Sequence, residues 1–310
     1  MIAVLSGGTG GSKMVDGLAR TVGQENLTAI INTADDGDFY GLRVCPDLDI
    51  CTYVLAGVVD ARGWGYADDT FACLEGLETY GLESWFGLGD RDLATHVFRT
   101  VRLSQGAALH EVAAELAERL GVAARVLPMC NEPVRTRITT PEGVRTFQEY
   151  LVRGGAREDI TSLQVEGLPQ ATPAPGVLDA IRDAATVVIA PSSPIVSIGT
   201  ILGVPGVRDA VAARRDRVVA VSPIVGRAPV EGPAHKFLAG AGYPECSAAV
   251  MAEIYADVAA TFVMHHTDAA EAPRVEAAGV RPVLTDVLMP DTASRARLAA
   301  ACLAAVDPAA

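Results

Sequence analysis

The residues best suited to chemistry lie between Met1 and Asp49, where a glycine-rich loop precedes a group of carboxylates. The loop runs from Ser6 to Lys13, reads SGGTGGSK and follows a short apolar run. Glycine lets the backbone approach a phosphate closely, and the N–H groups at the start of a helix favour negative charge. We therefore predict a phosphate-binding loop whose contacts come from Gly7, Gly8, Thr9, Gly10, Gly11 and Lys13.

The loop matches neither of the two common nucleotide fingerprints. A P-loop requires glycine before its lysine, but Ser12 stands there, and a GxGxxG pattern counted from Gly8 would require glycine at position 13. An NAD(P) dehydrogenase is therefore disfavoured. Lys13 and Lys236 are the only lysines, and every other basic side chain is Arg. This pattern fits selection for a compact positive charge at a phosphate site, and chance survival explains it equally well.

Carboxylates gather directly after the next apolar run, which ends at Ile31. Unpaired, they would repel one another, so we infer a cation or a bound donor group among them. Some also precede an expected helix over 50–59, where at least one would serve as a cap. The group consists of Asp35, Asp36, Asp38, Asp47 and Asp49.

These loops require a parallel sheet to bring them together. The expected fold is α/β, a Rossmann-like doubly wound parallel sheet of about six strands. Ligands of such sheets bind beyond the carboxyl ends of the strands, where loops at 191–199, 222–226 and 265–268 follow the expected strands. Those strands are Ile2–Leu5, Leu27–Ile31, Thr186–Ala190, Arg217–Val221, Ala260–Met264 and Val280–Leu284.

The middle of the chain changes pattern. Residues 67–81 and 109–120 are expected to be helical, and alternation over 134–140 and 144–152 predicts a hairpin. We assign 1–60 and 170–310 to a nucleotide-binding α/β core and 61–169 to an inserted helical and hairpin lobe. His96 and Arg99 lie one turn apart on another expected helix, where a packed histidine is the favoured interpretation.

Composition limits the classes of partner. The 310 residues carry a formal net charge of −13 and a pI near 4.8, so nucleic acid and anionic membranes are disfavoured. The 6 cysteines show no metal-binding spacing. With neither a signal peptide nor a long apolar run recognised, we expect reduced thiols and a cytoplasmic protein.

Several stretches, in order along most of the chain, resemble the 2-phospho-L-lactate transferase family (CofD-type). They are SGGTGGSK at 6–13, NTADDGDFYGLRVCPDLD at 32–49, WFGLGDRDLATH at 85–96, FQEYLVR at 147–153, APSSPIVSIGTIL at 190–202 and AVSPIVG at 220–226. The resemblance implies magnesium-dependent transfer of a phospholactyl-type group from a guanosine diphosphate-linked donor to the deazaflavin Fo. GMP would be released, in the biosynthesis of coenzyme F-420.

The resemblance also implies roles for individual residues. Asp49 and Arg91 would hold Fo. Loops at 191–193 and 222–226 would face the donor phosphates and guanine. The nucleotide contacts expected there are those of Ser192, Ser193, Ser222 and Gly226. The chain has Ser193 where we expect asparagine in the family pattern, so that amide contact is not carried over.

The mechanism expected from this resemblance is in-line phosphoryl transfer. Mg²⁺ would be held among Asp35, Asp36 and Asp49, and Lys13 would stabilise phosphate oxygens. Asp36 and Asp49 are the expected catalytic residues, and Asp49 serves as metal ligand or as base. The transferred acid stays open among phospholactate, phosphoenolpyruvate and phosphoglycerate, and we expect a homodimer. The alternative is a CofD-like nucleotide-sugar-binding regulator without catalysis, against which the GDRD loop at 89–92 argues.

Overall fold

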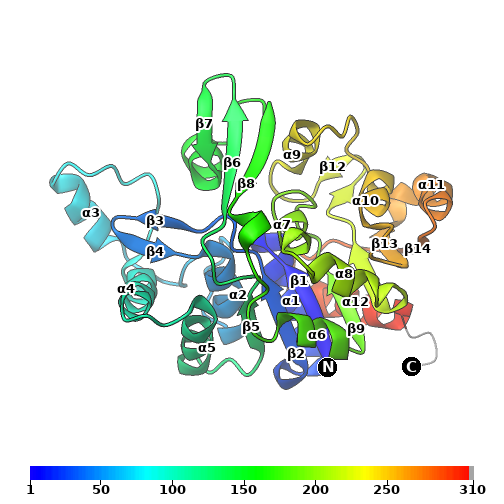
Figure 1. The fold of residues 1–310 in the computed structure, drawn as a ribbon, viewed down its shortest axis with the longest axis horizontal. Coiled ribbons are helices and arrows are strands. Elements are labelled where there is room, and N and C mark those ends of the chain that lie inside the picture. Colours follow the sequence, from blue (N-terminus) through cyan, green and yellow to red (C-terminus); the bar gives the residue numbers. More distant parts are fainter. Residues whose placement is uncertain (307–310) are drawn as a thin grey trace.

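Seven parallel strands form the central sheet of the computed structural model, which describes residues 1–306 (Figure 1). Their order is β14-β13-β10-β9-β1-β2-β5. The strands are β1 (Ile2–Ser6), β2 (Leu27–Ile31), β5 (Arg125–Pro128), β9 (Thr186–Ile189), β10 (Val218–Val221), β13 (Thr261–His265) and β14 (Arg281–Thr285). The strand order changes direction at β1: β2 pairs with one edge of β1, and β9 pairs with its other edge. Ligands of doubly wound sheets bind at such a reversal point.

The α/β fold predicted from the sequence is confirmed, with one strand more than the six expected. The additional strand, β5, pairs with β2 at the edge of the sheet. It has four residues and ends at Pro128, so its run is too short to carry a clear periodicity. The sheet therefore extends into the segment 61–169 that was assigned to the inserted lobe.

Helices cover both faces of the sheet. Successive side chains of a strand point to opposite faces, so they pack into two different apolar clusters, one on each face. Val4 packs with the helices of one face, and Ala3 and Leu5 pack with those of the other. The first face carries α1 (Gly8–Val22), α2 (Pro46–Ala56), α5 (Leu109–Arg119) and α12 (Thr292–Val306). The second carries α6 (Val177–Asp183), α7 (Ile198–Gly203), α8 (Val207–Ala212), α9 (Ala234–Gly240), α10 (Ala248–Tyr255) and α11 (Ala272–Ala277).

An antiparallel three-stranded sheet, β7-β6-β8, projects from the core beside α9 (Figure 1). It consists of β6 (Arg135–Thr140), β7 (Gly143–Thr146) and β8 (Ser162–Glu166). The predicted hairpin is present, but its second strand ends at Thr146 instead of continuing to 152. The N–H and hydroxyl of Thr146 both donate to the Glu149 carboxylate, at 2.8 and 2.9 Å, which starts a π-helical turn over Glu149–Arg153.

The remaining strands and α-helices form two hairpins and two helices. They are the hairpins β3 (Gly37–Phe39) with β4 (Leu42–Val44) and β11 (Ile224–Val225) with β12 (Ala228–Pro229), and the helices α3 (Ala72–Thr79) and α4 (Asp90–Ser104). Helix α2 begins at Pro46, earlier than the expected residue 50, because proline is favoured in the first helical turn. Asp47 and Asp49 therefore lie inside that turn. Among residues 1–306, no helix has the length and apolar character needed to cross a bilayer.

Candidate functional site

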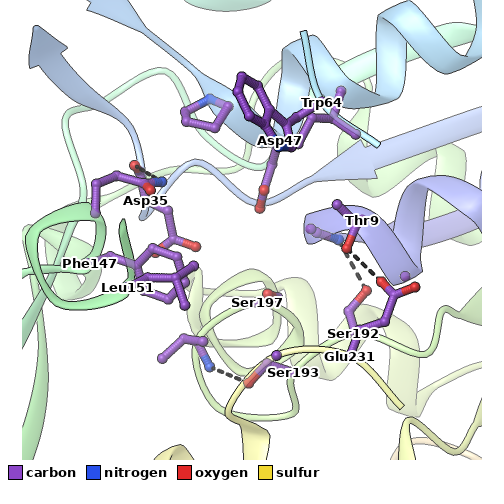
Figure 2. A pocket seen from close by; sticks show the side chains of 18 of the residues that line it. Thr9, Asp35, Asp47, Trp64, Phe147, Leu151, Ser192, Ser193, Ser197 and Glu231 are labelled. Atoms are coloured by element: carbon purple, nitrogen blue, oxygen red, sulfur yellow. Dashed lines mark hydrogen bonds between the residues drawn. The ribbon is translucent and has the colours of Figure 1, made fainter. Parts of the chain in front are cut away.

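A cavity of about 420 Å³ opens beside the carboxyl ends of β1 and β9, between the glycine loop, α2, α4 and the turn after β7. The glycine loop lines it together with Asp35, Asp47 and Asp49 of the acidic group, as their common position at one sheet edge predicts. Figure 2 shows Thr9 and Glu231 on one side of this space and Phe147 and Leu151 on the other. Of the residues predicted for the site, those lining the cavity are Gly7, Gly8, Thr9, Gly10, Lys13, Asp35, Asp49, Ser192, Ser193 and Ser222.

Close neighbours explain why the loop needs glycine. A Cβ atom on Gly7 would lie 2.8 Å from the Asp47 carboxylate and 2.8 Å from Cβ of Ser197. Gly8 has a φ of +68°, which L side chains rarely adopt, and nothing lies within 4 Å of its Cβ position. Gly7 thus permits close packing of the glycine loop against Asp47 and Ser197. Gly8 provides the positive φ at which the chain turns into α1, and the space beside it is open.

Asn32, Asp35 and Asp47 form a buried polar group at the end of β2. The Asn32 Nδ2 amino group donates to Asp35 Oδ2 at 2.9 Å and to Asp47 Oδ2 at 3.0 Å. Its carbonyl oxygen accepts from the Ala34 N–H at 3.0 Å and the Thr200 hydroxyl at 2.7 Å, which fixes the orientation of the amide. One amide therefore holds two carboxylates together.

Burial and mutual repulsion destabilise the charges on these carboxylates. Burial, followed by repulsion from Asp47, raises the pKa of Asp35 well above its usual value. Burial raises the pKa of Asp47 to about 6, although hydrogen bonds from Asn32 and the Gly8 N–H act in the opposite direction. Asp35 Oδ1 is also buried without a hydrogen-bond partner. A cation between the two carboxylates would relieve both effects.

Of the predicted metal ligands Asp35, Asp36 and Asp49, only Asp35 and Asp49 line the cavity. Asp36 is buried but does not line the cavity, and burial raises its pKa to about 7. No three His, Cys, Asp or Glu side chains within residues 1–306 are grouped to hold a metal ion. Mg²⁺ commonly binds one or two carboxylates together with substrate phosphates and water, and Asp35 with Asp47 fits that donor set.

Asp49 has a different partner, the buried guanidinium of Arg99. Arg99 Nη1 donates to Asp49 Oδ2 at 3.1 Å, and Nη2 donates to Oδ1. The same Nη1 lies 3.1 Å from Nδ1 of His96, so this nitrogen accepts and the ring hydrogen resides on Nε2, 3.2 Å from Asp92 Oδ1. Burial raises the pKa of Asp49, with Arg99 acting in the opposite direction. His96 is packed, as expected, and it also lines the cavity.

Loops after β9 and β10 supply the serines. Ser192 Oγ accepts from the Gly7 N–H at 3.2 Å, which ties two neighbouring strand-end loops together. Ser193 Oγ accepts from the Val196 N–H at 3.3 Å, and the Ser222 hydroxyl bonds both the N–H and the carbonyl of Ile224. These serines shape their own turns as well as the cavity wall.

Three predicted contacts lie outside the cavity lining. Gly11 packs against Ser6 and Ser192, and the Gly226 N–H donates to Asp268 Oδ1 at 2.8 Å. Arg91 is exposed, and its guanidinium donates to the Ala67 carbonyl at 3.4 Å. Of the two lysines, Lys13 reaches the cavity, whereas Lys236 bonds the carbonyls of Arg157 and Glu158.

Sequence reasoning missed three residues of the site. Asp47 is in the predicted acidic group, but it is not among the predicted metal ligands, whereas the structure places it beside Asp35. Arg99 carried a usable signal, because a basic residue three positions after His96 shares its helix face. Glu231 carried none: its carboxylate reaches Lys13 Nζ and accepts from the Thr9 hydroxyl at 2.5 Å across 222 positions of sequence.

The rest of the cavity wall carries mainly apolar side chains, several of them aromatic, and this part is called the aromatic wall. Phe147 and Leu151 enter from the turn after β7, and Trp64 comes from the loop after α2 (Figure 2). Phe86 stacks on Phe39, with ring centroids 3.8 Å apart, which fixes one edge of this wall. Flat apolar walls of this kind suit a planar ring system, whereas the glycine loop suits an anion.

Comparison with known proteins identifies relatives over nearly the whole chain. The family model described as 2-phospho-L-lactate transferase CofD matches residues 2–300. The chain is 43% identical to a phosphoenolpyruvate transferase of Kitasatospora aureofaciens, over 99% of this chain and 98% of that protein. It is 38% identical to a 2-phospho-L-lactate transferase of Methanosarcina mazei, over 96% and 97% of the respective chains.

Among solved structures, a protein of the UPF0052 family from Bacillus halodurans superposes with a TM-score of 0.64. That match covers 97% of this chain and 98% of the other at 20% identity, and it concerns the fold alone. The family match extends along almost the whole sequence, and each of the six stretches that carry the resemblance contributes residues to the cavity lining. The chain belongs to the 2-phospho-L-lactate transferase CofD family.

Proposed function

We propose that this protein transfers a phosphorylated three-carbon acid group from a guanosine diphosphate-linked donor to a hydroxyl of the deazaflavin Fo, releasing GMP. The supporting observation is one cavity that combines a glycine loop with Lys13, a pair of buried carboxylates and an aromatic wall. The glycine side suits a diphosphate, and the aromatic wall suits the flat deazaflavin ring.

Asp35 and Asp47 are the proposed ligands of Mg²⁺. Bound there, the ion would neutralise charge on the diphosphate as the bond to GMP breaks. Asn32 and the Gly8 N–H hold the Asp47 carboxylate beside the glycine loop, which supports this role. Lys13 and the loop N–H groups would bind the remaining phosphate oxygens.

Asp49 is the proposed acceptor-side residue. Asp49 lines the cavity, and both of its carboxylate oxygens pair with Arg99, which is not a partner of the proposed metal pair. In the reaction, the Fo hydroxyl oxygen forms a bond to phosphorus and the bond from phosphorus to the oxygen of GMP breaks. Asp49 would orient that hydroxyl and take its proton, a role that its raised pKa favours.

The experiment incubates the protein with Fo, Mg²⁺ and one guanosine diphosphate-linked donor at a time, and product mass identifies the acid. Phosphoenolpyruvate is the first choice, because the relative at 43% identity carries that name, whereas the phospholactate enzyme is 38% identical. Donor binding without any product would favour the regulatory alternative. A homodimer remains a prediction, to be checked by light scattering.

A further inference from the structure

A carboxylate of the protein itself occupies the anion side of the cavity. Glu231 Oε2 accepts from the Thr9 hydroxyl at 2.5 Å (Figure 2). Its Oε1 pairs with Lys13 Nζ. Within residues 1–306, Lys13 has no other hydrogen-bond or ion-pair partner. The only cation of the glycine loop is therefore neutralised by a glutamate from a segment far along the sequence.

The segment that carries Glu231 joins β12 to α9 and is weakly held. The N–H groups of Glu231 and Gly232 bond to no atom of the described chain, and the nearest backbone bond on one side is that of Val230 to the Pro223 carbonyl at 2.9 Å. Gly232 has a φ of +64° with open space around its Cβ position. Few contacts oppose displacement of this segment, so its local opening costs little.

The Glu231 pair itself is also easy to break. The side chains of Lys13 and Glu231 are 27% and 33% exposed, and partly exposed ion pairs contribute little to stability. A ligand phosphate carries more negative charge than a carboxylate and accepts from several donors at once. It would therefore displace Glu231 at modest cost.

We propose that Glu231 is an internal competitor for the phosphate-binding position and determines which ligands remain there. In the free protein it holds Thr9 and Lys13. A ligand phosphate that reaches Lys13 must displace it, and its return after the reaction favours release of GMP. This inference rests on the proposed function, and it assigns to Glu231 the role of weakening phosphate binding.

The test measures dissociation constants of inorganic diphosphate and of GMP by calorimetry at fixed Mg²⁺, for the wild-type protein and Glu231→Gln. If Glu231 competes, the variant binds both ligands about two- to fivefold more tightly, which corresponds to removal of a partly exposed pair. Glu166→Gln is the matched control: it removes one charge from the surface pair with Arg137, whose atoms lie 2.8 Å apart, and should change neither constant.

A double-mutant cycle identifies the partner. In a Lys13→Ala background the Glu231→Gln change should tighten binding less than in the wild type, since only the competition at Thr9 then remains. Unchanged or weaker binding in Glu231→Gln alone would overturn the inference and make Glu231 a support for Lys13. Tighter binding in a protein that transfers nothing to Fo would leave the inference standing and refute the proposed function.

Discussion

The carboxylates of Asp35 and Asp47 share one hydrogen-bond donor, the Asn32 amino group, at 2.9 and 3.0 Å. The groups that shift the pKa of these two carboxyls include no basic residue in the described part of the chain. The two buried carboxylates are thus held by neutral donors, and their mutual repulsion is not offset by a positive charge. This relationship is the structural basis for placing a divalent cation beside the glycine loop.

Removal of one of these carboxylates should separate metal binding from folding. Asp47→Asn is expected to weaken Mg²⁺-dependent donor binding by at least about tenfold, because even the loss of residues that only support metal ligands costs 10- to 100-fold. Calorimetric titrations with and without Mg²⁺ measure the effect. Asp36→Asn is the neighbouring control, since Asp36 does not line the cavity. Equal losses in both variants would remove Asp47 from the metal site.

Asp36 should make stability depend on pH. Burial raises its pKa to about 7, so between about pH 4 and pH 7 the folded protein binds more protons than the unfolded chain. The contribution of this group to stability is therefore largest below about pH 4 and is lost as the pH rises to 7. We expect Asp36→Asn to raise the melting temperature at pH 8 and to change it little at pH 4.

Thermal unfolding in EDTA at the two pH values provides the measurement. Asp159→Asn, which alters an exposed carboxylate, is the control. If the shift of Asp36→Asn were the same at both pH values, ionisation of this carboxyl would not be its cause.

Arg99 should matter for folding as well as for the site, because its loss leaves Asp49 buried without a counter-charge. Arg99→Met is expected to destabilise the protein by about 3–5 kcal/mol, as found when one partner of a buried pair is removed. Urea unfolding of Arg99→Met and Arg99→Lys measures the change in stability. The lysine variant should lose less stability than the methionine variant, because it keeps a positive charge beside Asp49. A Met variant as stable as the wild type would mean that Asp49 is neutral in the folded protein.

The aromatic wall should affect only the acceptor. Trp64 is 38% exposed and its ring lies 4.3 Å from the Arg62 guanidinium, so its removal should leave the fold intact. Trp64→Ala is expected to weaken Fo binding about three- to tenfold while donor binding stays unchanged. Fluorescence titration with Fo and calorimetry with GMP separate the two, and a loss shared by both ligands would contradict the assignment.

The sequence predicts the sheet well because each core strand is a short apolar run followed by turn residues, as at Ile2–Ser6 before Gly7. It also brings the glycine loop and Asp35 together, since both follow neighbouring parallel strands. The sequence does not predict which charged side chains pair with one another. Nothing local distinguishes Asp49, which pairs with Arg99 on α4, from Asp47, which shares Asn32 with Asp35.

Contacts between distant segments could not be predicted for the same reason. Glu231 meets Lys13 only because the loop before α9 folds back over the cavity, and this depends on packing of the whole molecule. The edge strand β5 was placed in the lobe because pairing with β2 is a tertiary contact that a four-residue run does not reveal. Periodicity describes elements, whereas the partners of charged groups follow from tertiary structure.

The central claim is tested most directly by measuring GMP release from the guanosine diphosphate-linked donor in the presence of Mg²⁺, with and without Fo. We predict that GMP appears only when Fo is present, in a one-to-one ratio with a phosphorylated Fo product, and that Asp49→Asn reduces the rate by orders of magnitude. Donor that stays intact on the protein while Fo is bound, or GMP release that does not require Fo, would contradict the account.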